Sequence, residues 1–392
     1  MKMIITLLIV VLFLTLTAFS QSFQDYKKQE QQNFQQYKES EQKAFAAYKK
    51  QEQEGIEKLR KEIEAYWGQN GFVTSTNKDW VEYSTDKQSR SDVDFKNGKA
   101  TVQVLLSEKE ASNPKLVRKK LEDAVEKLAL TKGKTRDFST PAERPKALES
   151  VPVLKGQLQT KEGKVVNASN VKQYAKEEVT PGVIQKEIVK GTDGVQRTKF
   201  TINLNLAPDY IKIRAAIYQT DIAKYAHARK LPSDLLFAVI HTESFFNPKA
   251  TSSAPAFGLM QLVPSSGALD AYRFLYNRGR LITANFLFNP DNNIKLGSAY
   301  LQLLMSRYFS RVKDPDSRIL CAVAAYNTGP GNVARAFTGS TDPGQAIPYI
   351  NKMTYHELYK FLSRHLPYEE TRNYIAKVTQ RMVMYHNWKL GK

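Results

Sequence analysis

The apolar residues follow three successive periods along this chain of 392 residues, and this change in period limits the fold more than any other feature. An eleven-residue spacing comes first, strand-like runs follow, and a helical spacing dominates from Asp209 onward. Apolar residues that recur every three to four positions indicate helices, and alternating ones indicate strands. The sequence therefore predicts an α+β chain with a long N-terminal helix, a mixed α+β accessory domain and an all-helical domain.

The first region carries an internal repeat of large apolar residues. Pairs three residues apart recur at eleven-residue intervals, at Phe23 and Tyr26, Phe34 and Tyr37, Phe45 and Tyr48, and Ile56 and Leu59. Eleven residues make three helical turns at about 3.67 residues per turn, so the pairs form one stripe on a helix. We expect a helical stalk over residues 21–66. Its stripe packs on its own domain or on another copy, or the helix spaces the body of the protein from a membrane.

Residues 1–20 are typical of an export signal. Lys2 supplies a positive charge, the stretch from Ile4 to Leu16 is almost wholly apolar, and small residues precede a cleavage site before Gln21. An uncleaved anchor is the alternative, because the apolar run reaches the lower limit for crossing a bilayer. We expect an exported, periplasmic protein, with membrane association through the N-terminus if the segment is retained. The lone cysteine, Cys321, excludes an intrachain disulfide.

The charge balance indicates an anionic partner. The chain has 58 Lys and Arg against 39 Asp and Glu, a net charge of +19 at pH 7. Nucleic acid, an anionic membrane or an acidic wall polymer would each suit this charge. Export and the lack of a recognisable binding motif argue against nucleic acid. The sequence shows no cluster with metal-ligand spacing, so we predict neither metal nor cofactor, and it does not fix the oligomeric state.

The second region, residues 67–207, is predicted to be a separate α+β domain. Strands are expected over residues 100–106 and in a hairpin formed by residues 183–189 and 198–206, with a helix over 115–130 and an exposed loop over 132–150. No His, Cys or paired carboxylates group here as a catalytic site would require. We therefore expect only a wall-binding or positioning role.

The third region, residues 208–392, is predicted to be helical. Expected helices lie near residues 209–229, 233–243, 290–311, 315–327, 330–337, 354–363 and 368–388. Proline and glycine punctuate them, at Pro232, Pro248, Pro290, Pro330 and Pro343 among others. Short helices separated in this way indicate a compact domain rather than a coiled coil.

One carboxylate in this region is well placed for chemistry. Glu243 lies in the last turn of an apolar helix, before Phe245 and Phe246. Burial and the negative end of the helix dipole would both raise its pKa. A carboxylic acid that is protonated near neutral pH can donate a proton to a leaving oxygen. Downstream, Tyr326 and Asn327 end another apolar helix and suit stacking on a sugar and bonding to its N-acetyl group.

Four short motifs occur in an order that resembles the lytic transglycosylases with a lysozyme-like fold. They are Glu243-Ser244, Gly258-Leu-Met-Gln261, Ala325-Tyr-Asn-Thr-Gly329 and Glu370-Thr-Arg-Asn-Tyr374. Segments 78–83, 90–91, 94–98 and 154–157 resemble the N-terminal domain of the membrane-bound lytic murein transglycosylase C family. The similarity covers roughly residues 60–390. The cysteine that carries a lipid in that family is missing, and Pro255-Ala256 stands where the family has Gly-Ala.

This resemblance implies cleavage of the β-1,4 bond between N-acetylmuramic acid and N-acetylglucosamine in peptidoglycan, with formation of 1,6-anhydro ends during wall turnover. It implies Glu243 as the single catalytic acid, assisted by Tyr374. It also implies substrate-binding positions, at Ser244, Ser252, Met260, Gln261, Tyr326 and Asn327.

Two other functions would also fit these residues. A goose-type lysozyme-like hydrolase would share the fold and the acid but deliver water to the sugar, and a non-catalytic wall-binding scaffold would need neither. A second carboxylate remains open because Asp270 and Asp291 flank the region. The long segment from Val263 to Phe288 is expected to be a solvated loop.

Overall fold

A computed structural model describes residues 39–40, 43–132, 152–252, 255–280 and 282–390. The predicted export signal, the first two pairs of the repeat and nearly all of the predicted loop at 132–150 lie outside these residues. The chain divides into two units between Gln51 and Glu52. Residues 43–67 are helical, which agrees with the helix predicted from the last two repeats. None of the described helices combines the length and apolar character needed to cross a bilayer.

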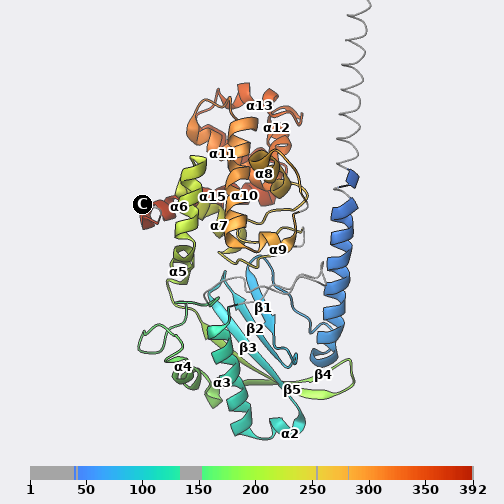
Figure 1. Ribbon diagram of the computed structural model, residues 1–392. Helices are drawn as coiled ribbons and strands as arrows, with labels where there is room; N and C mark the ends of the chain where they lie inside the picture. The colour runs from blue at the N-terminus through green and yellow to red at the C-terminus, as the bar shows by residue number, and fades with distance from the viewer. Residues whose placement is uncertain (1–38, 41–42, 133–151, 253–254, 281, 391–392) are drawn as a thin grey trace, which may run out of the picture. The chain divides into compact units, whose positions relative to one another are not determined.

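The accessory region is a five-stranded antiparallel sheet with helices (Figure 1). The strands are ordered β1-β2-β3-β5-β4, with bounds β1 Asp79–Tyr83, β2 Ser89–Asp94, β3 Lys99–Leu106, β4 Gln185–Lys190 and β5 Gln196–Asn205. The helical elements are α2 Glu108–Ala111, α3 Pro114–Leu130, α4 Val171–Glu178 and the 3₁₀ turn η1 Pro181–Val183. The predicted hairpin, central strand and helix are thus confirmed.

The core of this region lies between the sheet and α3. On β3, Ala100, Val102 and Val104 are buried in alternation with more exposed residues, so one face of the strand packs inward. Helix α3 contributes Leu121 and Val125 to the same cluster. A second, smaller cluster joins Ile63 and Trp67 of the helix over residues 43–67 to Tyr83 and Leu105 of the sheet, on strands β1 and β3.

From Tyr210 onward the chain is predominantly helical, as predicted (Figure 1). The elements are α5 Tyr210–Ile217, α6 Gln219–Arg229, α7 Ser233–Ser244, α8 Gly267–Tyr276, α9 Ala284–Leu287, α10 Pro290–Leu303, the π-helical turn η2 Leu304–Tyr308, α11 Pro315–Thr328, α12 Pro330–Thr338, α13 Pro343–Ile350, α14 Tyr355–His365 and α15 Glu369–Trp388.

One expectation for this region was wrong, and one helix was not predicted. The segment Val263 to Phe288 contains helices α8 and α9 rather than only a loop, because α8 buries Ala268, Ala271 and Tyr272. The predicted break at Pro343 coincides with the start of α13, a helix that was not predicted, and the side chain of Asp342 caps it. Proline suits the first position of a helix, since the backbone N–H that it lacks has no partner there anyway.

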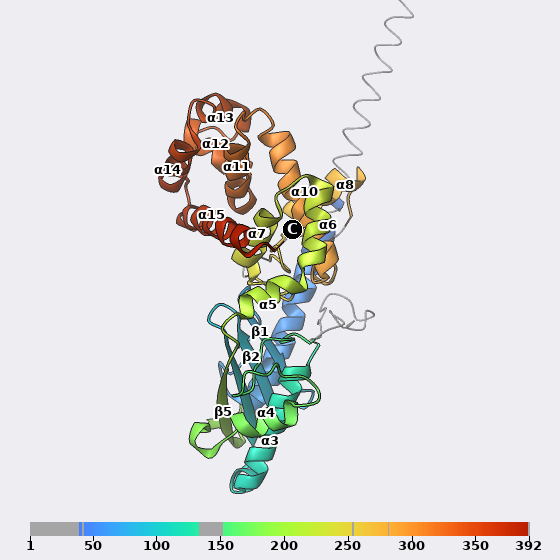
Figure 2. The ribbon, with the colours of Figure 1, turned by 90° about the vertical axis from the view of Figure 1, so that its left-hand side faces the viewer.

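Helix α7 is the centre of the helical region. Its residues from Leu235 to His241 are all buried, so it is enclosed on every side. It lies between α6 and α15 (Figure 2), and α15 makes the larger contact with it. This packing presents the C-terminal end of α7 to the side chains of α15.

Candidate active site

The packing of α15 on α7 brings Glu243 and Tyr374 into contact. The Tyr374 hydroxyl donates a hydrogen bond of 2.7 Å to Oε1 of Glu243. Tyr374 is 5% exposed, and Glu243 is only partly exposed. The two residues predicted as catalytic, which are 131 positions apart in the sequence, therefore form one site.

The surroundings of Glu243 favour its protonated form. Its pKa is raised from an ordinary 4.5 to about 8, mainly by burial and to a smaller extent by the nearby Glu370 carboxylate. The hydrogen bond from Tyr374 acts in the opposite direction, because it stabilises the carboxylate. Burial and the neighbouring Glu243 hold the pKa of Tyr374 well above its usual range, so the tyrosine stays a donor. A protonated carboxyl at neutral pH can serve as a general acid.

His241, two residues before Glu243, takes no part in this pair. Burial lowers its pKa to about 3, so its imidazole is neutral. Its Nδ1 lies 3.0 Å from the Tyr385 hydroxyl, and its ring packs edge-on against Phe245. These contacts make His241 part of the interior packing of α7.

The loop after α7 is tied to the helices on both sides. The Ser244 hydroxyl donates to the carbonyls of Ile240, at 3.0 Å, and Leu259, at 2.7 Å. The Tyr326 hydroxyl of α11 donates 2.7 Å to the carbonyl of Met260. Two side chains thus fix consecutive carbonyls of the Gly258–Gln261 motif relative to the helix that carries Glu243.

Asn293, which was not predicted as a site residue, also holds the Gly258–Gln261 loop in place. Its Oδ1 accepts from the Met260 N–H at 2.7 Å, and its Nδ2 donates to the carbonyls of Phe257 and Leu287. It is fully buried at the start of α10. Its sequence signal is weak, because Asn293 is one of three asparagines within the run Asn289 to Asn293.

Asn293 can pack closely against residue 258 because this residue is a glycine and has no side chain. The φ of Gly258 is +77°, and a side-chain carbon there would collide with Asn293 and with the carbonyl of Leu287. Residues other than glycine rarely adopt this backbone region. Gln261 also has a positive φ of 45°, and its Nε2 donates to the carbonyls of Ala250 and Gly258, both at 3.0 Å.

The structure divides the predicted substrate-binding residues into two groups. Ser244 and Met260 are fully buried, so they support the loop instead of facing a ligand. Gln261, Tyr326 and Asn327 are partly exposed, and the Asn327 side chain accepts a 2.7 Å bond from Thr371, one turn before Tyr374. Ser252 is also partly exposed, and its backbone N–H donates to the carbonyl of Ala256 at 3.2 Å.

The two carboxylates left open by the sequence have other surroundings. Asp291 accepts hydrogen bonds from Tyr225, at 2.7 Å, and Lys224, at 3.0 Å. Burial raises the pKa of Asp270, and Arg273 and Arg307 oppose that shift. Within the described ranges, no three His, Cys or carboxylate side chains converge as metal ligands.

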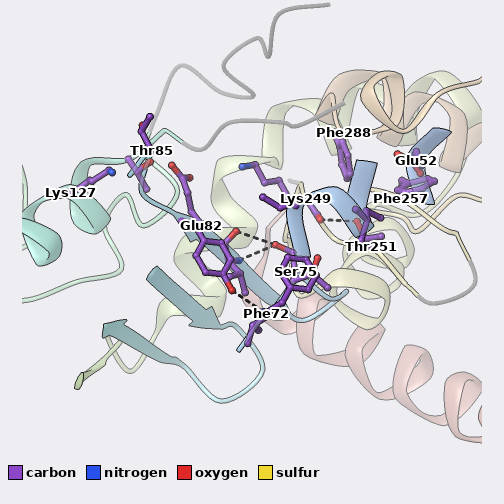
Figure 3. Close-up of a pocket in the computed structure, with 17 residues that line it drawn as sticks. Glu52, Phe72, Ser75, Glu82, Thr85, Lys127, Lys249, Thr251, Phe257 and Phe288 are labelled. Atoms are coloured by element: carbon purple, nitrogen blue, oxygen red, sulfur yellow. Dashed lines mark hydrogen bonds between the residues drawn. The ribbon is translucent and has the colours of Figure 1, made fainter. Parts of the chain in front are cut away.

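A cavity of about 430 Å³ lies away from Glu243, between the strand β1 and the start of the loop (Figure 3). Its lining residues include Phe72 and Tyr83 of the accessory region and Thr251, Phe257 and Phe288 of the helical region. None of the residues predicted as catalytic or substrate-binding lines it. The cavity therefore belongs to the junction of the sheet and the loop, not to the Glu243 site.

Comparisons with known proteins match both halves of the chain. The family described as "Transglycosylase SLT domain" matches residues 220–347, which include Glu243, Gln261 and Tyr326 but end before Tyr374. The family described as "Membrane-bound lytic murein transglycosylase C, N-terminal domain" matches residues 37–216.

Relatives that match most of this chain carry the same family name. A membrane-bound lytic murein transglycosylase C of Klebsiella pneumoniae is 31% identical over 324 residues, which are 82% of this chain and 86% of that protein. A protein of the same name from Actinobacillus succinogenes is 28% identical over 326 residues, 83% of this chain and 86% of that protein.

Among solved structures, an inactive mutant of the lytic transglycosylase Slt from Pseudomonas aeruginosa matches with a TM-score of 0.35 and 29% identity, over 44% of this chain. The 70 kDa soluble lytic transglycosylase of Escherichia coli matches with a TM-score of 0.34 and 24% identity, also over 44% of this chain. This chain spans about a quarter of the length of each, 24% in both cases.

Replacing Gly258 with alanine should damage the site. The Gly258→Ala variant must both adopt a strained φ and displace Asn293, so we expect a loss of more than about 2 kcal/mol in unfolding free energy and at least a tenfold lower activity. Gly339→Ala is the matched control, because Gly339 has a φ of +71° with no atom close to a new side chain. It should lose about 1 kcal/mol and keep its activity. If Gly258→Ala and Gly339→Ala lost the same stability in denaturant titrations and the same activity in assays, the role given to Asn293 would be contradicted.

The raised pKa of Glu243 also predicts a pH-dependent stability. Because the folded pKa lies above the ordinary value, the folded state binds the extra proton, and wild-type stability falls as pH rises from about 4.5 to 8. Glu243→Gln removes this titration. We expect the variant to gain on the order of 1–3 kcal/mol over wild type between pH 5 and pH 8.5. A stability difference that is constant with pH in thermal melts would exclude the shift.

Proposed function

We propose a reaction and a set of residue roles for this chain, which belongs to the membrane-bound lytic murein transglycosylase C family. The chain is thus a lytic murein transglycosylase, an enzyme that acts on peptidoglycan. The observation that carries the residue roles is the Glu243–Tyr374 pair, in which a carboxyl with a pKa of about 8 accepts a hydrogen bond from a tyrosine.

In the proposed reaction Glu243 acts first as an acid and then as a base. The protonated carboxyl gives its proton to the glycosidic oxygen between N-acetylmuramic acid and N-acetylglucosamine, and the C1–O bond breaks. The 6-hydroxyl of the muramoyl residue then closes on C1 and gives its proton to the Glu243 carboxylate. The products are a 1,6-anhydromuramoyl end and a free 4-hydroxyl. No water is consumed, and Glu243 regains the proton it gave.

Tyr374 has a role in both halves of this cycle. Its hydroxyl can donate to the carboxylate that exists between the two proton transfers, and so lowers the free energy of that charged intermediate. It cannot act as a nucleophile at neutral pH, because its own pKa is held high by burial and by Glu243. The positive charge that develops at C1 is assigned to the substrate's own N-acetyl group.

Three of the remaining predicted residues form the proposed sugar-binding surface. Gln261, Tyr326 and Asn327 are partly exposed around the pair and present amide and aromatic groups. Such groups suit hydrogen bonds to N-acetyl arms and stacking on sugar faces. Ser252 is assigned to the same loop, and Ser244 and Met260 support it from the interior.

The location of the enzyme is also a proposal. We propose that residues 1–20 direct export and that the protein works at a membrane facing the wall, since the relatives carry the name "membrane-bound". The net charge of +19 would concentrate the enzyme on an anionic polymer.

Mass spectrometry of muropeptides released from purified sacculi tests the reaction. Wild type should release products lighter by one water than hydrolytic ones, and Glu243→Gln should release none. Asp291→Asn is the matched control, a carboxylate-to-amide change at a residue already bound by Lys224 and Tyr225, and it should retain the products. Reducing ends from wild type would identify a hydrolase. No product from wild type would favour a scaffold, and loss with Asp291→Asn would require a second carboxylate.

Cell fractionation tests the location. With its own N-terminus, the chain produced in a host with a periplasm should accumulate in the membrane fraction, accessible to protease added to the periplasm. A chain lacking residues 1–20 should stay in the cytoplasm. Recovery of the full chain as a freely soluble periplasmic protein would contradict membrane association while leaving export intact.

A further inference from the structure

The helix that carries Glu243 ends in an unusual backbone conformation. Phe245 and Phe246 follow the last turn of α7 with φ values of 51° and 59°, both in the left-handed region. Residues other than glycine rarely occupy this region, because the side-chain Cβ then lies too close to the following carbonyl oxygen. Two in succession require surrounding contacts that hold them in place. The end of α7 is therefore fixed from outside the helix.

Arg214 supplies those contacts. This residue of α5 is 2% exposed, and its guanidinium donates from Nε to the carbonyl of Phe245, at 3.0 Å, and from Nη2 to the carbonyl of Phe246, at 2.6 Å. A planar guanidinium can bind two carbonyls at once in a fixed geometry, whereas a lysine ammonium cannot. The positive charge also lies at the negative end of the α7 dipole.

The other side of the same guanidinium is held by the accessory region. Its Nη1 donates to Oε1 of Gln157 at 3.0 Å, and its Cζ lies 3.4 Å from the ring centre of Phe95. Gln157 is itself fully buried. It is held in place because its side-chain Nε2 donates to the carbonyl of Val153 and its backbone carbonyl accepts from the N–H of Ala207. One side chain therefore joins the sheet region to the end of the catalytic helix.

The side chain of Phe245 makes the same connection through apolar contacts. It is buried in the core cluster that contains Phe95 and the sheet residues, although it belongs to the end of α7. Its ring also packs on His241 and lies 5.1 Å from the guanidinium of Arg381. The backbone turn that follows Glu243 is thus shared between two regions of the protein.

We infer that Arg214 is a positioning residue for the catalytic acid: it holds the left-handed turn at Phe245 and Phe246, and through it the accessory region sets the position of Glu243 against Tyr374. Glu243 is two residues from the first carbonyl that Arg214 binds, and Ser244 links the same turn to the loop at Leu259. A small displacement of this turn would alter the 2.7 Å contact with Tyr374 and the hydration of the carboxyl. This inference rests on the proposed catalytic role of Glu243.

Arg214→Lys tests the inference on a soluble peptidoglycan fragment. The ammonium keeps the charge but cannot hold both carbonyls, so we expect kcat to fall at least about tenfold while KM changes less than about threefold. The basic limb of the kcat–pH profile, set near pH 8 by Glu243, should move to lower pH because a displaced carboxyl is better hydrated. A purely structural role would lower the melting temperature without moving this limb.

Tyr210→Phe is the matched control. Tyr210 lies one turn before Arg214 on α5 and also bonds to the sheet region, at the carbonyls of Phe95 and Lys96, but it makes no bond to α7. We expect Tyr210→Phe to be less stable than wild type but to keep the wild-type kcat and the basic limb of the kcat–pH profile. If Arg214→Lys does not fold, Gln157→Leu is measured in its place, since it weakens the same connection from the other side and should show a smaller shift in the same direction.

The outcomes separate this inference from the proposed function. Wild type must form anhydro products and Glu243→Gln must not, whatever Arg214 does. If these hold and the folded Arg214→Lys or Gln157→Leu enzyme has the kcat and pH limb of the Tyr210→Phe enzyme, Arg214 is only structural and the inference is overturned. Failure of wild type to form anhydro products would instead overturn the proposed function.

Discussion

The packing of α15 against α7 is the contact on which the candidate site depends. It encloses the end of a helix that is already apolar on every side, and it places a tyrosine hydroxyl 2.7 Å from the one carboxyl in that turn. The same contact supplies the desolvation that keeps Glu243 protonated and the donor that stabilises its ionised form. These two effects oppose each other in the pKa, and a group that must both give and take a proton benefits from that balance.

Much of this arrangement could be predicted from the sequence. The period of the apolar residues located α7, α11 and α15, and the position of Glu243 after a buried helix indicated a raised pKa. The sheet hairpin followed from its glycine-containing turn. Local patterns were sufficient in these cases because one segment of chain carries the whole signal.

The sequence could not show contacts that join distant segments. Asn293 anchors the loop from 33 residues beyond Met260, and its type is ordinary at the start of a helix. Arg214 reads as one basic residue among many, yet it is buried against the end of another helix 31 residues away. The turn at Phe245 and Phe246 also contradicts local preference, since nothing in two phenylalanines indicates a left-handed backbone. In each case tertiary contacts outweigh the local propensity.

Phe245 is part of the hydrophobic core of the accessory region, which limits how the helical region could be recombined with another domain. A catalytic module that ends cleanly at a linker can be transferred by recombination to a new neighbour without repair. Here the crossover would cut through a shared interior, leaving an aromatic side chain and a buried cation without their surroundings. Exchange of the accessory region alone would therefore take away the buried partners of Phe245 and Arg214 at the end of α7.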